Sequence, residues 1–122
     1  MAPVIAGHRG LDEFAPENTA PAFIAAWELG MAIEFDVHLS RDGELVVIHD
    51  PTLDRTTDGS GAVADHDLTA LKSVDAGSWR GKEFAGERIL TLDETLALAA
   101  KHGRATTTLV LEAKVDEPGM AA

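Results

Sequence analysis

The chain has 122 residues, of which 45% are hydrophobic and 25% charged, and its formal net charge is −11. This length and balance are typical of one soluble globular domain and exclude a disordered chain. The negative charge argues against nucleic acid or an anionic membrane surface as a partner. Cysteine is absent, which excludes disulfides and thiolate catalysis.

The N-terminal segment shows no targeting signal. Residues 1–5 have neither the basic start nor the apolar length of a signal peptide. No apolar stretch approaches the roughly 20 residues that a bilayer-spanning helix needs. We therefore expect a cytoplasmic protein without a membrane span.

Strands and helices alternate in the first half of the chain. A strand is expected at residues 4–6, and Asn18 or Thr19 can cap a helix that ends at Gly30. Further strands are expected at residues 32–37 and 45–49. The alternation favours a parallel sheet covered by helices. However, residues 40–44 are too short for a parallel crossover, so one of these two strands can pair antiparallel instead.

The second half begins with a long irregular segment. Residues 50–88 are rich in Asp, Gly, Ser and Thr, with one short helix expected at 67–74. Such length is typical of a functional loop or an inserted subdomain. Thr91 and Glu94 then form a capping-box pattern before a helix that runs to Gly103. A fourth strand is expected at residues 107–114.

Several carboxylates lie on the predicted strands. Residues two apart on a strand share a face, so Glu34 projects with Asp36, and Glu112 with Lys114. Three converging carboxylates would repel one another unless they bound a cation, and oxygen ligands are those that Mg²⁺ and Ca²⁺ prefer. The alternative for Glu34 and Asp36 is a strand-end ion pair with Arg or Lys.

Two histidines and two cations complete this polar group. His8 and His49 each end an apolar strand, and a pair of histidines near neutral pH can accept and donate protons. A single histidine at such a position more commonly has a structural role. Two histidines beside the acidic pair Glu34 and Asp36 instead favour a catalytic role. Arg9 offers a planar charged fork suited to phosphate. Lys114 is a second cation, whose alternative is a salt bridge to Glu112 or Glu34.

The remaining candidates are assigned structural roles. We expect His38, His66 and His102 on the surface. Residues 54–61 lack the ligand spacing of a calcium loop and are expected to form a turn. Trp27 should lie in the core, and Trp79 should line a pocket lid or anchor it.

The ordered motifs resemble those of the glycerophosphodiester phosphodiesterase family. They are His8-Arg9-Gly10, Pro16-Glu17-Asn18-Thr19, Glu34-x-Asp36, Asp42-Gly43, Val46-Val47-x-His49-Asp50, Leu53-x-Arg55-Thr56-Thr57 and Glu112-x-Lys114. The resemblance implies a (β/α)₈ barrel with its active site at the C-terminal mouth. It also implies metal-dependent hydrolysis of glycerophosphodiesters to glycerol 3-phosphate and an alcohol.

The resemblance implies a role for each site residue. Glu34, Asp36 and Glu112 would bind Ca²⁺ or Mg²⁺, and His8 and His49 would be the acid/base pair. Arg9 and Lys114 would contact the phosphate, and Asn18 would be a supporting position near the site. The segment at about 50–90 matches the place of the family's insertion, on the alcohol-binding side.

The length suggests about the first half of such a barrel. A closed barrel takes about 250 residues and the smallest about 200, so residues 1–122 would form its N-terminal portion, with about four strands and the insertion. Three alternatives stay open: a piece of a larger enzyme, a pseudo-barrel completed by a second copy through open sheet edges, or a non-catalytic half-barrel that binds a divalent cation or a partner.

Overall fold

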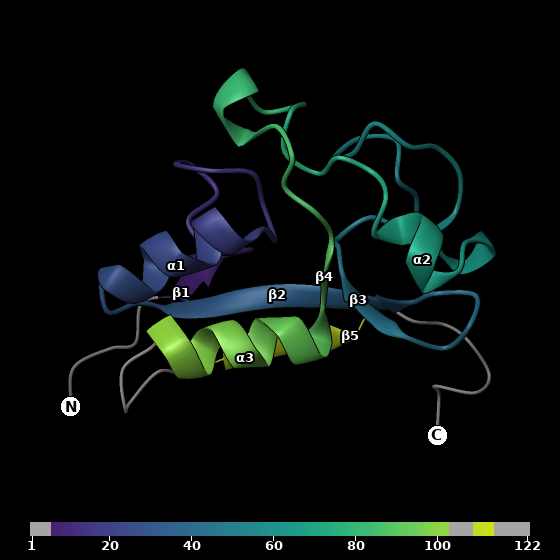
Figure 1. The fold of residues 1–122 in the computed structure, drawn as a ribbon. Helices are drawn as coiled ribbons and strands as arrows, with labels where there is room; N and C mark the ends of the chain where they lie inside the picture. The colour runs from purple at the N-terminus through teal and green to yellow at the C-terminus, as the bar shows by residue number, and fades with distance from the viewer. Residues whose placement is uncertain (1–5, 103–108, 114–122) are drawn as a thin grey trace.

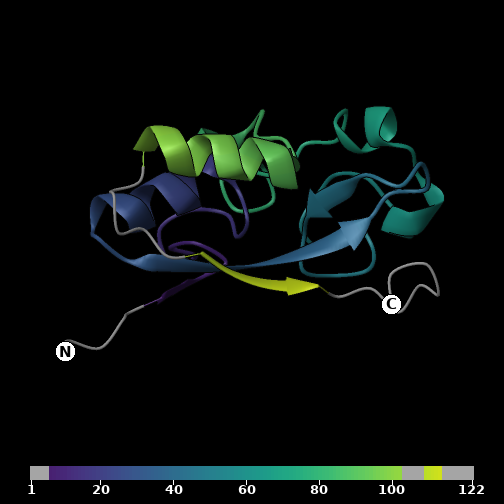
Figure 2. The same ribbon diagram turned by 90° about the horizontal axis from the view of Figure 1, so that it is seen from below.

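The computed structural model describes the backbone of residues 6–102 and 109–113 and the side chains of residues 8–102. In this part of the chain, two longer helices cover one face of the parallel strands (Figures 1 and 2). The elements are β1 (Ala6–His8), α1 (Ala20–Glu28), β2 (Ala32–Leu39), β3 (Leu45–Val47), η1 (Val63–Asp65), α2 (Leu68–Leu71), η2 (Lys82–Phe84), β4 (Leu90–Thr91), α3 (Leu92–His102) and β5 (Leu109–Ala113).

Strand β2 organises the sheet. It pairs in parallel with β1 and with β5, and antiparallel with β3, which in turn pairs with β4. Ile33 is paired with both β1 and β5, and Val37 with both β3 and β5. Because a strand has two edges, β1 and β3 share one edge of β2 and β5 occupies the other.

The predicted strand at 45–49 is therefore not a barrel-type parallel strand. The turn between β2 and β3 is closed by the Ser40 amide, which donates to the Glu44 carbonyl at 2.8 Å, and Gly43 has φ of +86°. This confirms the antiparallel alternative that the short connection indicated. Among the described residues, β1, β2 and β5 are the parallel strands. Of the four strands that the sequence predicted, three are therefore parallel barrel strands, and the fourth, β3, forms an antiparallel hairpin with β2.

Alternation along β2 separates an apolar face from a polar one. Ile33, Phe35 and Val37 are buried against α1 and α3, where Phe23 lies with its ring centroid 6.0 Å from that of Phe35. Trp27 belongs to the same core, as expected. Glu34, Asp36 and His38 occupy the alternate positions of β2.

The long segment after β3 forms a second core of its own. Leu53, Val63 and Leu71 are almost completely buried with Val46 and Ile89. Figure 1 places α2, within this segment, beside β3 and away from α1. Helix α2 has one turn and is shorter than predicted, because residues 72–74 form a turn and not helix. The segment is thus a packed unit and not an open loop.

Capping decides where helix α3 begins. The Thr91 amide donates to Glu94 Oε1 at 2.9 Å, and the Glu94 amide donates to Thr91 Oγ1 at 3.0 Å. This reciprocal pair is the capping box that the sequence predicted. Helix α1 follows Thr19, whose hydroxyl instead donates to the Pro16 carbonyl at 2.6 Å.

The surface position expected for His38 is wrong. Its side chain is 8% exposed, and its Nε2 donates to the His49 carbonyl at 2.9 Å. The reason is that β2 extends to Leu39, which places His38 inside a paired strand. None of the helices within residues 6–102 combines the length and the apolar character needed to cross a bilayer.

Candidate active site

Strand pairing places His8 beside the first acidic residue. His8 is the last residue of β1 and lies opposite Glu34 of β2 in register. His8 Nε2 is 3.3 Å from Glu34 Oε2, and His8 Nδ1 is 3.5 Å from Asp12 Oδ2. The ring is exposed and lies between two carboxylates. Such a group can carry a proton to or from a bound molecule.

Two carboxylates lie close together on β2. Asp36 is 1% exposed and the Glu34 side chain 19% exposed. Glu34 Oε2 and Asp36 Oδ2 are both buried and accept no hydrogen bond within the described residues. Burial raises the pKa of Glu34, and the negative charge of Asp36 raises this pKa further. The nearby His8 and Arg9 offset only part of this rise.

The sequence predicted a third carboxylate for this position. Glu112 lies opposite Asp36 in the parallel register of β2 and β5. Its side chain, and the whole of Lys114, fall outside the described residues, so these two predictions stay untested. Among the described side chains, no group of three or more His, Asp and Glu residues is arranged to hold a metal ion. The oxygen donors and buried, unpartnered atoms of Glu34 and Asp36 nevertheless fit a divalent cation.

Arg9 is held on the same side of the site. Its Nη1 donates to Glu17 at 3.2 Å, and its Nε is 3.9 Å from Asp36 Oδ2. Arg9 has φ of +55°, and its carbonyl accepts the Asn18 amide at 2.8 Å. Arg9 Nε is buried without a hydrogen-bond partner in the described part of the chain. Arg9 Nε thus faces Asp36 at a distance too long for a hydrogen bond.

Packing against α1 explains the glycine that follows Arg9. Gly10 has φ of +82°, and a Cβ there would lie 2.8 Å from the backbone carbon of Ala22. The turn after β1 therefore approaches α1 too closely for a side chain. This close approach fixes the backbone that carries His8 and Arg9.

His49 follows β3 and is oriented by its neighbour. Its Nδ1 lies 2.8 Å from Asp50 Oδ1. Two hydrogen bonds from Arg55 lower the pKa of Asp50 far below its ordinary value, and the bond from His49 lowers it further. The ionised carboxylate can only accept, so the proton of this bond resides on His49 Nδ1. In a neutral His49 ring, Nε2 then carries no proton and has no hydrogen-bond partner within the described residues.

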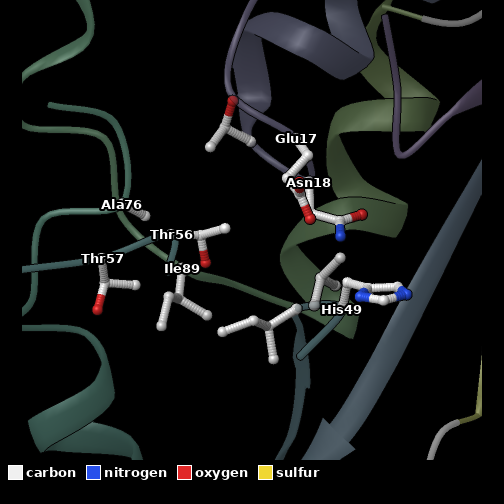
Figure 3. A pocket seen from close by; sticks show the side chains of 10 residues that line it. Glu17, Asn18, His49, Thr56, Thr57, Ala76 and Ile89 are labelled. Carbon is white, nitrogen blue, oxygen red and sulfur yellow. The ribbon is translucent and has the colours of Figure 1, made fainter. Parts of the chain in front are cut away.

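Asn18 lies in a pocket with His49. Figure 3 shows its side chain between Glu17 and His49, with Thr56 and Ile89 across the pocket. Asn18 is 4% exposed, and neither Oδ1 nor Nδ2 of its side-chain amide has a hydrogen-bond partner among the described residues. Its φ of +58° is uncommon for a residue other than glycine. These features suit a polar group that binds a ligand.

The structure thus joins the predicted residues in two groups. His8, Arg9, Glu34 and Asp36 are linked by direct contacts, whereas Asn18 and His49 line one pocket. The sequence reasoning assigned no role to Glu17, Asp50 and Arg55, which connect these groups. Each of the three residues belongs to one of the motifs named in the sequence analysis. The opposite charges of Arg55 and the two carboxylates were the sequence feature that could have indicated an ion pair.

The comparisons with known proteins identify relatives. The model of the glycerophosphoryl diester phosphodiesterase family matches residues 8–116. A glycerophosphodiester phosphodiesterase of Caldanaerobacter subterraneus subsp. tengcongensis is 52% identical over 99 residues, which cover 80% of this chain and 41% of that protein. Glycerophosphodiester phosphodiesterase 1 of Mus musculus is 39% identical over 98 residues, 78% of this chain and 30% of that protein.

Solved structures are similar over the same portion. A phosphodiesterase from Oleispira antarctica, in complex with the product sn-glycerol-3-phosphate, has a TM-score of 0.85 and 42% identity over 92% of this chain and 44% of that one. A glycerophosphodiester phosphodiesterase from Agrobacterium tumefaciens has a TM-score of 0.83 and 38% identity over 93% of this chain and 47% of that one. These similarities confirm the predicted fold class, part of a (β/α)₈ barrel. The chain spans less than half the length of these relatives.

Proposed function

Because the chain belongs to the glycerophosphoryl diester phosphodiesterase family, we propose that it contributes to the hydrolysis of glycerophosphodiesters to glycerol 3-phosphate and an alcohol. The observation that carries the proposal is the buried carboxylate pair Glu34 and Asp36, whose unpartnered oxygens lie beside His8 and Arg9. This arrangement combines a cation site, an anion contact and a titratable group.

Glu34 and Asp36, together with Glu112, would hold Ca²⁺ or Mg²⁺. The raised pKa of Glu34 and the buried oxygens support this proposal, as does the register position of Glu112 opposite Asp36. When bound, the cation would offset negative charge on the phosphoryl oxygens. The positive charge of the cation would also counter the repulsion between an anionic substrate and a chain of net charge −11.

Arg9 would contact the substrate phosphate, with Lys114 as a second cation. Support for Arg9 comes from its fixed position between Glu17 and Asp36 and from its buried, unpartnered Nε. A guanidinium held in this way loses little conformational entropy when it binds an oxyanion. Asn18, with both amide atoms unpartnered, would support the same region from the pocket side.

His8 and His49 would exchange the protons of the reaction. We propose that one ring takes the proton of the neighbouring glycerol hydroxyl as that oxygen attacks phosphorus, and that the other protonates the leaving alkoxide. Water then adds to phosphorus and opens the resulting cyclic phosphate, which gives glycerol 3-phosphate. For His49 the available atom is Nε2, because Nδ1 is bonded to Asp50. His8 has a carboxylate near each ring nitrogen, Asp12 near Nδ1 and Glu34 near Nε2.

An activity assay tests this function directly. Release of glycerol 3-phosphate from glycerophosphocholine is measured with Ca²⁺ or Mg²⁺ for the wild type, His8→Ala and His49→Ala. Loss of a general acid or base should lower kcat by about 10²- to 10⁴-fold. His102→Ala, at the end of α3, is the control and should retain the wild-type rate. Turnover that survives both site substitutions overturns the acid/base assignment.

Cation binding separates the catalytic hypothesis from the binding one. Calorimetry with Ca²⁺ or Mg²⁺ is performed on the wild type and on Asp36→Asn. Cation-dependent turnover that disappears with EDTA supports the enzyme. Cation binding without turnover, abolished by Asp36→Asn, would instead favour a half-barrel that binds a cation and hydrolyses nothing.

A further inference from the structure

We propose that Arg55 is a positioning residue, which holds His49 and Arg9 in one fixed arrangement through Asp50 and Glu17. The inference rests on the proposed function in that it takes His49 and Arg9 as site residues. Arg55 itself lies in the segment after β3, and within the described residues its side chain bonds to Asp50 and Glu17 and to neither His49 nor Arg9. It acts through the two carboxylates that orient them.

On the His49 side, Arg55 fixes the carboxylate of Asp50. Arg55 Nε donates to Asp50 Oδ2 at 2.8 Å, and Arg55 Nη2 donates to Asp50 Oδ1 at 2.9 Å. The same Oδ1 accepts from His49 Nδ1 at 2.8 Å. Both oxygens of Asp50 are therefore occupied, so the carboxylate plane cannot rotate freely. The His49 ring is held with Nδ1 toward Asp50.

On the Arg9 side, Arg55 shares a carboxylate with a second guanidinium. Arg55 Nη1 and Nη2 donate to Glu17 Oε1 and Oε2 at 2.9 and 3.0 Å. Arg9 Nη1 approaches the same two oxygens at 3.3 and 3.2 Å. The Glu17 side chain is only 9% exposed, which protects these bonds from water. Because Glu17 precedes α1 and Asp50 follows β3, Arg55 links two separate segments of the chain.

The geometry requires an arginine. Four donated hydrogen bonds reach two carboxylates in two bidentate pairs. A lysine ammonium has three donors and no planar fork, so it cannot make both pairs at once. The hydrogen bonds that Arg55 donates to Asp50, and then those to Glu17, also raise the pKa of Arg55 above its ordinary value.

A purely stabilising salt bridge is the competing explanation, and a matched residue separates the two. Arg41 donates to Asp67 in the same bidentate manner, at 2.9 and 3.0 Å. It lies outside the pocket that His49 and Asn18 line. Arg41→Gln therefore removes a comparable ion pair without disturbing the proposed site.

The test is the tautomer of His49, read from ¹⁵N spectra of the labelled chain at a pH at which the ring is neutral. The wild type and Arg41→Gln should show His49 as the Nδ1–H tautomer. Arg55→Gln, and Arg55→Lys if the first variant does not fold, should give a mixture with at least several-fold more Nε2–H form. Unchanged His49 signals in a folded Arg55 variant overturn the proposal.

This readout does not depend on turnover, so failure of the proposed function is recognised separately. A tautomer change in a chain without activity supports the role of Arg55 while contradicting the enzyme hypothesis. In an active chain, Arg55→Lys should lower kcat by about 10- to 100-fold, as removal of an orienting group does. The same substitution should have little further effect in His49→Ala, because residues that act as a unit are not additive. Full additivity would overturn the proposal.

Discussion

Replacement of Asp36 by Asn should stabilise the cation-free chain. Asp36 is 1% exposed, its Oδ2 accepts no hydrogen bond within the described residues, and Glu34 adds a like charge on the same face. A buried, unsatisfied polar group costs about 1–3 kcal/mol, and a charged one more. The lost contact with Arg9 Nε, at 3.9 Å, is too long for a hydrogen bond and offsets only part of this cost. We expect the free energy of unfolding to rise by about 1–2 kcal/mol.

The opposite result is expected with cation present. At a free concentration about 100 times its Kd, a cation bound to the folded wild type stabilises it by about 2.7 kcal/mol. Asp36→Asn should lose this gain, because a proposed carboxylate ligand has been replaced by a neutral amide that binds cations more weakly. Urea denaturation followed by the fluorescence of buried Trp27, with EDTA and with CaCl₂, measures both effects.

An exposed acidic residue provides the control. Glu44→Gln removes the same charge at an exposed position and should change neither measurement by more than about 0.5 kcal/mol. The reasoning is refuted if Asp36→Asn destabilises the cation-free chain by more than about 1 kcal/mol. It is equally refuted if the variant retains the full stabilisation by cation.

Three further predictions concern the scaffold of the site. Backbone amides of Ser78 and others hold the pKa of Asp75 far below its ordinary value of 3.8, so this contribution to stability is present above about pH 4 and is lost as pH falls below it. The protection of the Ser78 amide, its exchange rate compared with that of an unprotected amide at the same pH, should fall in acid, and less so in Asp75→Asn. Thr91→Ala should cost about 1 kcal/mol in urea denaturation, and no loss would contradict the capping box. Gly10→Ala should lower the unfolding free energy by at least about 1 kcal/mol, because φ is +82° and the new Cβ meets Ala22; an unchanged midpoint would contradict this.

The sequence by itself determined the features that depend on local periodicity. Alternation along residues 32–37 predicted that Glu34 and Asp36 share a face, and the structure places both together opposite the apolar core. The pattern at Thr91 and Glu94 predicted the start of α3. The short connection before Leu45 indicated antiparallel pairing. These features follow from interactions within a few residues, which the order of amino acids encodes directly.

Only the tertiary structure decided the relations between distant segments. The link from Glu17 through Arg55 to Asp50 depends on two segments folding against each other, and charge signs in a sequence do not say which carboxylate an arginine reaches. The burial of His38 depended on how far β2 extends and on its pairing with β3. Likewise, the segment after β3 became a packed unit because Leu53 and Leu71 meet around it. Such contacts depend on three-dimensional packing. Residue patterns therefore indicated candidate site residues, but not the residues that hold them in position.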